Sequence, residues 1–314
     1  MSRPARVSPQ PSSLEVLSHN SKSFWLASLF LSKEQQRHAA QLYAFCRGVD
    51  DAVDETTDAR KAQRSIERFR RELRSGLCLD PCVQRYRALM DSHRLPLYAA
   101  EDLLDGMETD LGAVRIETDD ELFLYCYRVA GTVGIMMCGV LGVSAPKALR
   151  PAVRLGMAMQ LSNICRDVLE DAQRDRVYLP SSRLRAQGIS PEVLVKGEAP
   201  VDAIQEVVRS LLLDADQLYD EGRAGLHYIP WRSRFTIHVA AAVYQQIGHR
   251  LLRKHGGNPL GGRTVVPLWE KVWAIGVQSV RVLMGRLSLA GPSSDGRLDG
   301  VVNLMHEDNQ QGEM

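Results

Sequence analysis

Acidic residues at helical spacing stand out between positions 43 and 54, where the sequence reads YAFCRGVDDAVD. At about 100° per residue, one face of a helix there would carry Tyr43, Arg47, Asp50, Asp51 and Asp54. The other positions are mostly apolar, so this face is expected to lie against protein rather than bulk water. Carboxylates in such a place need a cation beside them. For this stretch alone, a solvated acidic face at the end of a helix is an equal alternative.

A second stretch, QLSNICRDVLED at positions 160–171, repeats the pattern. Gln160, Asn163, Asp167 and Asp171 fall within about 80° of one another on a helix, with Arg166 at the edge of that face. Two such helices facing each other would form a cage of hard oxygen ligands. Such ligands suit magnesium better than zinc or copper.

The arginines beside these aspartates indicate that the bound group is an anion held through metal, and a diphosphate bridged by Mg²⁺ fits best. Forked donors to its oxygens are expected from Arg47, Arg166 and Arg176, with further contacts from Ser21, Lys22 and Ser23. If the metals stabilise a leaving diphosphate, the organic half of the substrate becomes a carbocation. Such an intermediate requires a dry, apolar cavity.

Lining for such a cavity is expected from the helix at 125–145, where Gly131 and Gly134 leave room on one face. Phe24, Trp25 and Tyr125 are candidates to stabilise positive charge through their ring faces. Close packing of two helices is the equal alternative for the glycines, and an ordinary core position is the alternative for each aromatic residue.

Several classes of protein lack support in the sequence. There is no GxxxxGK[ST] loop, no GxGxxG after a strand and no GxSxG elbow, and the eight histidines have no ligand spacing. The net charge of +1 gives no electrostatic case for nucleic acid. The six cysteines lie mostly in apolar runs without a CxxC pair, which predicts reduced core residues in a cytoplasmic protein.

Helical periodicity predicts an all-α fold, since no run of alternating β-branched residues is present. The main helices are expected at 33–55, 60–75, 97–111, 119–145, 147–174, 201–228, 233–254 and 267–287, with Ser32 and Gln35 capping the first of them. The acidic side chains at 102, 105, 108 and 110 are expected to be mostly solvated, although Asp105 could approach the cage. We read the uncharged run 129–145 as a buried central helix rather than a membrane span.

The simplest domain organisation is one helical domain around a central apolar cavity. It is expected to cover residues 15–288, between a disordered leader (1–14) and a disordered tail (289–314).

Four motifs, in order, resemble the squalene/phytoene synthase family over about residues 15–285. They are SKSF (21–24), YAFCRGVDDAVDE (43–55), YCYRVAGTVG (125–134) and QLSNICRDVLEDAQRDRVYLP (160–180). The resemblance implies an isoprenoid synthase fold. It also implies a head-to-head condensation of two identical prenyl diphosphates through a cyclopropyl intermediate, with loss of diphosphate.

Roles for individual residues follow from the same resemblance. The expected magnesium ligands are Asp50 and Asp54 in one motif, and Asn163, Asp167 and Asp171 in the other. The residues expected to hold diphosphate are Ser21, Tyr43, Arg47, Arg166 and Tyr178. Those expected near the reacting carbons are Tyr125, Gln160 and Tyr244. Cys165 and Leu169 depart from the family pattern but point off the acidic face.

The match is nearest to bacterial members of the family that join two C20 geranylgeranyl diphosphates to phytoene through prephytoene diphosphate, the first step of carotenoid biosynthesis. A C30 synthase making squalene or dehydrosqualene is the alternative, with NADPH required only for squalene. A non-catalytic scaffold of the same fold and a terpene cyclase are further alternatives. The lipid substrates imply a cytoplasmic protein with peripheral contact to the inner membrane and contact with downstream carotenoid enzymes.

Overall fold

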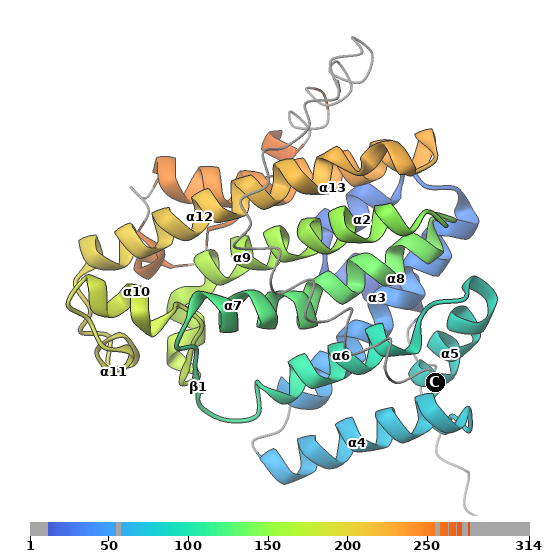
Figure 1. Ribbon diagram of the computed structural model, residues 1–314, viewed down its shortest axis with the longest axis horizontal. Helices are drawn as coiled ribbons and strands as arrows, with labels where there is room; N and C mark the ends of the chain where they lie inside the picture. Colours follow the sequence, from blue (N-terminus) through green and yellow to red (C-terminus); the bar gives the residue numbers. More distant parts are fainter. Residues whose placement is uncertain are drawn as a thin grey trace, which may run out of the picture.

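The computed structural model describes residues 12–54, 58–254, 258–262, 264–267, 269–271 and 276. Helices dominate this part, so the all-α prediction is confirmed. The long helices α9 (Leu149–Gln173), α12 (Val201–Ala224) and α13 (Trp231–Lys254) pack together along one side of the molecule (Figure 1). On the other side of α9 lie α3 (Lys33–Asp54), α6 (Leu97–Glu108) and α8 (Thr132–Val140).

Shorter elements complete the domain. The helices are α1 (Ser13–Asn20), α2 (Lys22–Ser28), α4 (Ala59–Ser75), α5 (Pro81–His93), α7 (Asp119–Cys126), α10 (Ser181–Ala186) and α11 (Pro191–Val195). Single turns are η1 (Tyr127–Gly131), η2 (Pro146–Ala148), η3 (Leu226–Tyr228) and η4 (Pro259–Gly261). The predicted tail 289–314, residues 1–11 of the leader and most of the helix predicted at 267–287 lie outside the described residues. Helix α1 begins two residues inside the predicted leader.

Side-chain caps fix where several of these helices begin. Ser32 Oγ accepts a hydrogen bond from the backbone N–H of Gln35 at 3.2 Å, as predicted for the start of α3. The Gln35 side chain accepts from the Ser32 hydroxyl rather than from its backbone, so the capping box is only half formed. Ser21 caps α2 in the same way, accepting from Phe24 N–H at 3.3 Å.

The run Asp119–Val140 is a continuous series of α7, η1 and α8, five residues shorter than predicted. It is long and apolar enough to cross a membrane, but 56% of its most apolar window is buried inside the molecule. Its side chains belong to the main core and pack against α6 and α9. The prediction of a buried central helix is therefore confirmed. The π-helical turn η1 lies where this run passes α6 and α9.

Glycines bring η1 and α8 into backbone contact with α9. A Cβ atom on Gly134 would lie 2.3 Å from the carbonyl oxygen of Ala152, and one on Gly156 would lie 2.3 Å from that of Ala130. Any side chain there would force the helices apart. Both glycines also line the central cavity. Gly134 therefore allows close helix packing and also leaves room at the cavity, so both alternatives apply to it.

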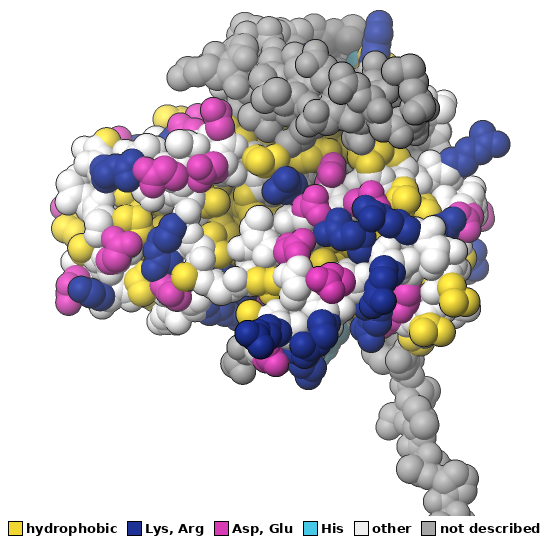
Figure 2. Space-filling view, turned by 60° about the horizontal axis from the view of Figure 1, so that its bottom comes forward, with side chains coloured by type: hydrophobic (Ala, Val, Ile, Leu, Met, Phe, Trp, Pro, Cys, Tyr) yellow, Lys and Arg dark blue, Asp and Glu magenta, His cyan; other side chains and the backbone are white. Residues whose placement is uncertain are grey.

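Two strands of two residues each, β1 (Val114–Arg115) and β2 (Arg176–Val177), pair in parallel with Val114 beside Arg176. They are too short to give a sequence signal, yet they hold the segment after α6 against the segment after α9. The six cysteines are all in described residues and none is in a disulfide; Cys126, Cys138 and Cys165 are buried, whereas Cys46, Cys78 and Cys82 are only partly buried. Acidic and basic side chains are interspersed over the face in Figure 2, with hydrophobic side chains between them.

Candidate active site

The first acidic stripe (Asp50, Asp51 and Asp54) lies at the C-terminal end of α3. Arg47, one turn earlier, donates to Asp50 at 2.8 Å and contacts Asp51 at 2.5 Å. Burial, followed by the neighbouring Asp54 carboxylate, raises the pKa of Asp50 to about 6, although Arg47 opposes the shift. Arg47 therefore compensates the negative charge on Asp50 only in part.

The second acidic stripe (Asn163, Asp167 and Asp171) follows one face of α9. Arg166 forms a two-pronged pair with Asp167, at 2.7 and 2.5 Å. Burial and then Asp167 raise the pKa of Asp171 to about 7. The Asn163 Oδ1 atom is buried and has no hydrogen-bond partner among the described residues. An amide oxygen in that condition is suited to receive a cation or a donor from a ligand.

Arginines after α9 connect the two stripes. Arg176 donates to Asp54 at 2.9 Å and to the carbonyl oxygen of Asp110 at 3.0 Å. Arg174 donates to the other oxygen of Asp54 at 3.1 Å. The RVYLP segment is thus held against the end of α3. Within the described chain, no three acidic, histidine or cysteine side chains lie close enough together to hold one ion.

Asp110 is a site residue that the sequence analysis missed. It was expected to be solvated, but it is 7% exposed and accepts hydrogen bonds from Tyr125 at 3.0 Å and Tyr178 at 2.6 Å. Burial raises its pKa to about 6 against these two hydrogen bonds. It lies beyond the end of α6, so helical periodicity carries no signal for it. Asp105, for which an approach to the cage was left open, pairs with Arg70 at 2.7 Å.

Tyr125 and Tyr178 lie in the core beside Asp110, and the roles that the resemblance implied for them stay predictions. Their rings stack at 4.8 Å and both hydroxyls point to Asp110. Neither side chain lines the cavity. Both support Asp110 from within the core, because each hydroxyl is already committed to its carboxylate. Trp25, a candidate for the cavity wall, is likewise absent from the described lining.

Aromatic rings from three elements meet beside the stripes. Phe24 lies 6.2 Å from Tyr43 and 4.9 Å from Tyr244, measured between ring centroids. All three line the cavity together with Gln160 and Asn163. Burial, and next Tyr244, raise the pKa of Tyr43 to about 12, so its hydroxyl stays protonated.

Two lysines lie at the start of α2: Lys22 is its first residue, and Lys271 contacts Ser23 in the same turn. Lys271 donates to Ser23 at 3.0 Å. Burial and then the charge of Lys22 lower the pKa of Lys271. Two ammonium groups that repel each other are well placed for an anion between them. Lys271 was missed because it lies far along the sequence from every motif.

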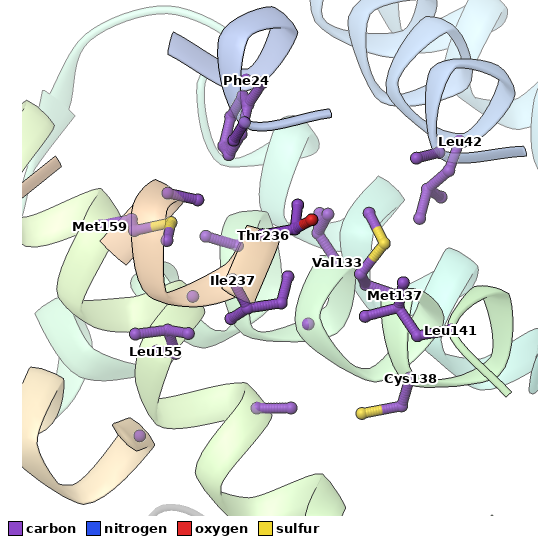
Figure 3. A pocket seen from close by; sticks show the side chains of 18 of the residues that line it. Phe24, Leu42, Val133, Met137, Cys138, Leu141, Leu155, Met159, Thr236 and Ile237 are labelled. Carbon is purple, nitrogen blue, oxygen red and sulfur yellow. The ribbon is translucent and has the colours of Figure 1, made fainter. Parts of the chain in front are cut away.

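The cavity itself has a volume of about 300 Å³ and is lined by α2, α3, α8, α9 and α13 (Figure 3). One end is polar, with Tyr43, Gln160 and Asn163. The other end is lined by apolar residues that include Leu141 and Pro151. Pro151 and Asn163 are about 18 Å apart along α9 at 1.5 Å per residue. The predicted central apolar cavity is present.

The sequence matches the profile of the squalene/phytoene synthase family over residues 17–270. The chain belongs to this family. The phytoene synthase of Thermus thermophilus is 38% identical, over 86% of this chain and 93% of that protein. A chloroplastic phytoene synthase of Daucus carota is 34% identical over 74% of this chain, and the match spans 61% of the carrot protein.

A solved member of the squalene/phytoene synthase family shares the fold. The crystal structure of a dehydrosqualene synthase in complex with ligand superposes with a TM-score of 0.78 at 27% identity, covering 87% of this chain and 95% of the other. The predicted isoprenoid synthase fold is therefore confirmed. In the present chain, Asn163 of the second stripe lines the polar end of the apolar cavity, and the first stripe begins about two turns beyond Tyr43 on α3. A cavity with such an end suits an amphiphile with an anionic head and a hydrocarbon tail.

Proposed function

We propose that this protein is a transferase that condenses two molecules of geranylgeranyl diphosphate head to head, giving phytoene through prephytoene diphosphate. The observation that carries the proposal is the shape of the site. Tyr43, Gln160 and Asn163 form the polar end of an apolar cavity, on the same helices as the two acidic stripes. The C20 substrate is favoured because the relatives with 31–38% identity over most of the chain are named phytoene synthase. The reaction would supply the first hydrocarbon of carotenoid biosynthesis.

Magnesium fits the residues that are present. The unpartnered Asn163 Oδ1 and the raised pKa values of Asp50 and Asp171, to about 6 and 7, both indicate oxygen ligands short of positive charge. Asp50 and Asp54 would hold Mg²⁺ on one side, and Asn163, Asp167 and Asp171 on the other. When bound, Mg²⁺ neutralises the diphosphate and makes it a better leaving group.

The arginines exchange partners in this proposal. Arg47, Arg166 and Arg176 are each paired with an aspartate of a stripe. Diphosphate oxygens offer the same forked geometry with more charge, so a guanidinium can move to the substrate as a cation takes over its aspartate. Lys22 and Lys271 supply further positive charge beside Ser21 and Ser23.

The cavity protects the carbocation that forms when diphosphate leaves. Its wall contains few polar groups, so water and other nucleophiles are excluded. The rings of Phe24, Tyr43 and Tyr244 lie next to one another and line the cavity near its polar end. They stabilise positive charge without donating electrons to a bond. Gln160 lines the same position and orients the reacting end.

The cellular setting is proposed on chemistry alone. Because both the substrate tail and the product are lipids, the protein is expected to be cytoplasmic with peripheral contact to the inner membrane. Transfer of the hydrocarbon to downstream carotenoid enzymes would take place there.

The test is product analysis. Purified protein with Mg²⁺ is incubated with C20 diphosphate, and separately with C15 diphosphate with and without NADPH, and the lipid extract is analysed by mass. We expect a C40 hydrocarbon from the C20 substrate. C30 product alone would assign a C30 synthase, with NADPH dependence marking squalene, and a cyclic product from one substrate molecule would assign a terpene cyclase. If neither substrate releases diphosphate, the non-catalytic scaffold is the alternative that remains.

A further inference from the structure

Four apolar side chains form a continuous strip between α2 and α13. Trp231 is 73% exposed and stands one turn from Phe235 on α13. The Phe235 ring meets Phe30 edge to face, with centroids 5.0 Å apart. Phe30 is itself 40% exposed, and its neighbour Leu29 is 53% exposed. We call Leu29, Phe30, Trp231 and Phe235 the aromatic strip. Large apolar side chains gathered in this way mark a surface that contacts something.

The strip has a basic border. Within 27–37 and 227–235 the basic residues are Lys33, Arg37, Arg232 and Arg234, against a single acidic residue, Glu34. The Arg232 guanidinium carbon lies 5.3 Å from the centre of the Trp231 ring. Exposed tryptophan beside arginine is typical of the boundary between hydrocarbon and water at a membrane, where the ring is half buried and the cation meets phosphate.

The same two segments also line the cavity from inside. Ser28 and Leu31 flank the strip on the α2 side, and Ile229, Thr236 and Ile237 flank it on the α13 side, and all of these line the cavity. Figure 3 shows Thr236 and Ile237 pointing inward. Other lining residues on these segments, Gly225 and Leu226, lie with Pro151 at the apolar end. The strip is therefore the outer surface of the wall farthest from the aspartates.

A small second core holds the two segments together. Ala27 of α2 packs with Val239, Ala240, Ala242 and Val243 of α13, and Phe235 packs against this cluster. The strip thus rests on a fixed base and not on a loop.

We propose that the aromatic strip docks on a bilayer that contains anionic lipids, with the apolar end of the cavity facing the membrane and the aspartates facing water. The docking stands on the strip and its basic border alone. Its consequence rests on the proposed function: the hydrocarbon product leaves through the apolar end directly into the bilayer, while diphosphate leaves at the opposite end into solution.

A second exposed apolar pair provides a matched control. Leu77 and Leu79, in the turn between α4 and α5, are 71% and 80% exposed. They lie beside the carboxylates of Asp80 and Glu72, which accept backbone hydrogen bonds in the same turn. Neither leucine nor its neighbours line the cavity. Arg68 contacts both carboxylates, so this turn differs from the strip in its distance from the cavity and in having no exposed aromatic ring.

The test is flotation of the full chain with vesicles of phosphatidylcholine alone or with added phosphatidylglycerol. We expect binding to the anionic vesicles that is weakened by salt. Trp231→Glu should lower partitioning at least about tenfold, and Arg232→Gln about fivefold on anionic vesicles only. The Leu77→Glu/Leu79→Glu double variant should bind as wild type does. Each variant's fold is checked by circular dichroism and Tm.

The proposed surface would be wrong if Trp231→Glu bound vesicles as strongly as wild type does. It would also be wrong if the Leu77→Glu/Leu79→Glu variant lost binding. Diphosphate release in detergent micelles separates this result from the proposed function, because it should be the same for wild type and Trp231→Glu. In vesicles, turnover by Trp231→Glu should fall at least about fivefold; equal turnover in both media would overturn the product route. If the wild-type protein binds vesicles but releases no diphosphate, the proposed function is wrong and the docking surface still stands.

Discussion

The acidic stripes of α3 and α9 differ in the source of their cations. On α3, Asp54 is held by Arg174 and Arg176, which reach it from the segment after α9. On α9, Asp167 is paired with Arg166, its immediate neighbour in sequence. Asp54 is therefore part of a contact that joins distant parts of the chain, whereas Asp167 is paired within its own helix, as Asp50 and Asp51 are with Arg47.

Because their cations come from different parts of the chain, the two stripes should contribute differently to the stability of the fold. The cations on Asp54 connect α3 to the RVYLP segment, so removing them should loosen the fold. The second stripe contains the unpartnered Asn163 oxygen and Asp171, whose pKa is raised to about 7. A stripe with unmet demand for positive charge should respond more strongly to Mg²⁺.

The largest effect is expected when either stripe loses a carboxylate. Asp50→Asn and Asp171→Asn should each lower kcat/KM by about 10³-fold while the protein stays folded, because metal-assisted departure of diphosphate needs both sides. The measurement is diphosphate release with C20 substrate. Asp105→Asn, on α6 and paired with Arg70, is the control and should change activity less than about twofold. Activity of either stripe variant within tenfold of wild type would remove that stripe from the site.

Helical periodicity was enough to predict the all-α class and the helix that carries each stripe, whereas the isoprenoid synthase fold was implied by the family resemblance. Spacing placed Asp50, Asp54, Asp167 and Asp171 correctly because each stripe lies on a single helix, where the angle per residue is constant. The apolar run around Gly134 was also identified as a core helix, since its length and lack of charge leave few other places for it.

Helical periodicity does not predict contacts between different helices and strands. Asp110 was assigned to solvent because the residues after α6 have no repeat, and only the pairing of β1 with β2 brings it beside Arg176. Lys271 reaches Ser23 across most of the sequence. For Tyr125 and Tyr178, motif likeness indicated the neighbourhood of the site but not the direction of the hydroxyl, which the carboxylate of Asp110 decides.

The cations on Asp54 allow a direct test of the comparison between stripes. Arg176→Gln should lower the free energy of unfolding by about 2 kcal/mol, because Arg176 is 14% exposed and its loss leaves one oxygen of Asp54 and the Asp110 carbonyl without a donor. Arg174→Gln should cost less than about 0.5 kcal/mol, since that arginine is 61% exposed on the same carboxylate. Urea denaturation measures both. Equal costs would mean that Arg176 does not join the segments.

A smaller effect is expected at the hydroxyls that support Asp110. Tyr125→Phe and Tyr178→Phe should each lower the free energy of unfolding by about 1 kcal/mol, the value of one buried hydrogen bond to a carboxylate. Activity should fall less than about tenfold in both, because neither ring lines the cavity. If Tyr125→Phe instead lost about 10³-fold in kcat at unchanged stability, Tyr125 would act on the substrate, as the family resemblance implied.

The smallest expected effect is a change in Tm on replacing Asp171 of the second stripe, which should depend on pH and on Mg²⁺. Burial and then Asp167 raise the pKa of Asp171 to about 7, with Asp110 acting in the same direction and Arg176 and Arg174 against it. The folded state binds this proton more tightly than the unfolded chain, so the stability it contributes is present at low pH and is lost as pH rises through 7. In EDTA at pH 8, Asp171→Asn should therefore raise Tm by about 2 °C, and the gain should shrink towards pH 4. Saturating Mg²⁺ should reverse the order at pH 8, because the ion stabilises only the wild-type carboxylate. A Tm gain that Mg²⁺ leaves unchanged would show that Asp171 does not bind the metal.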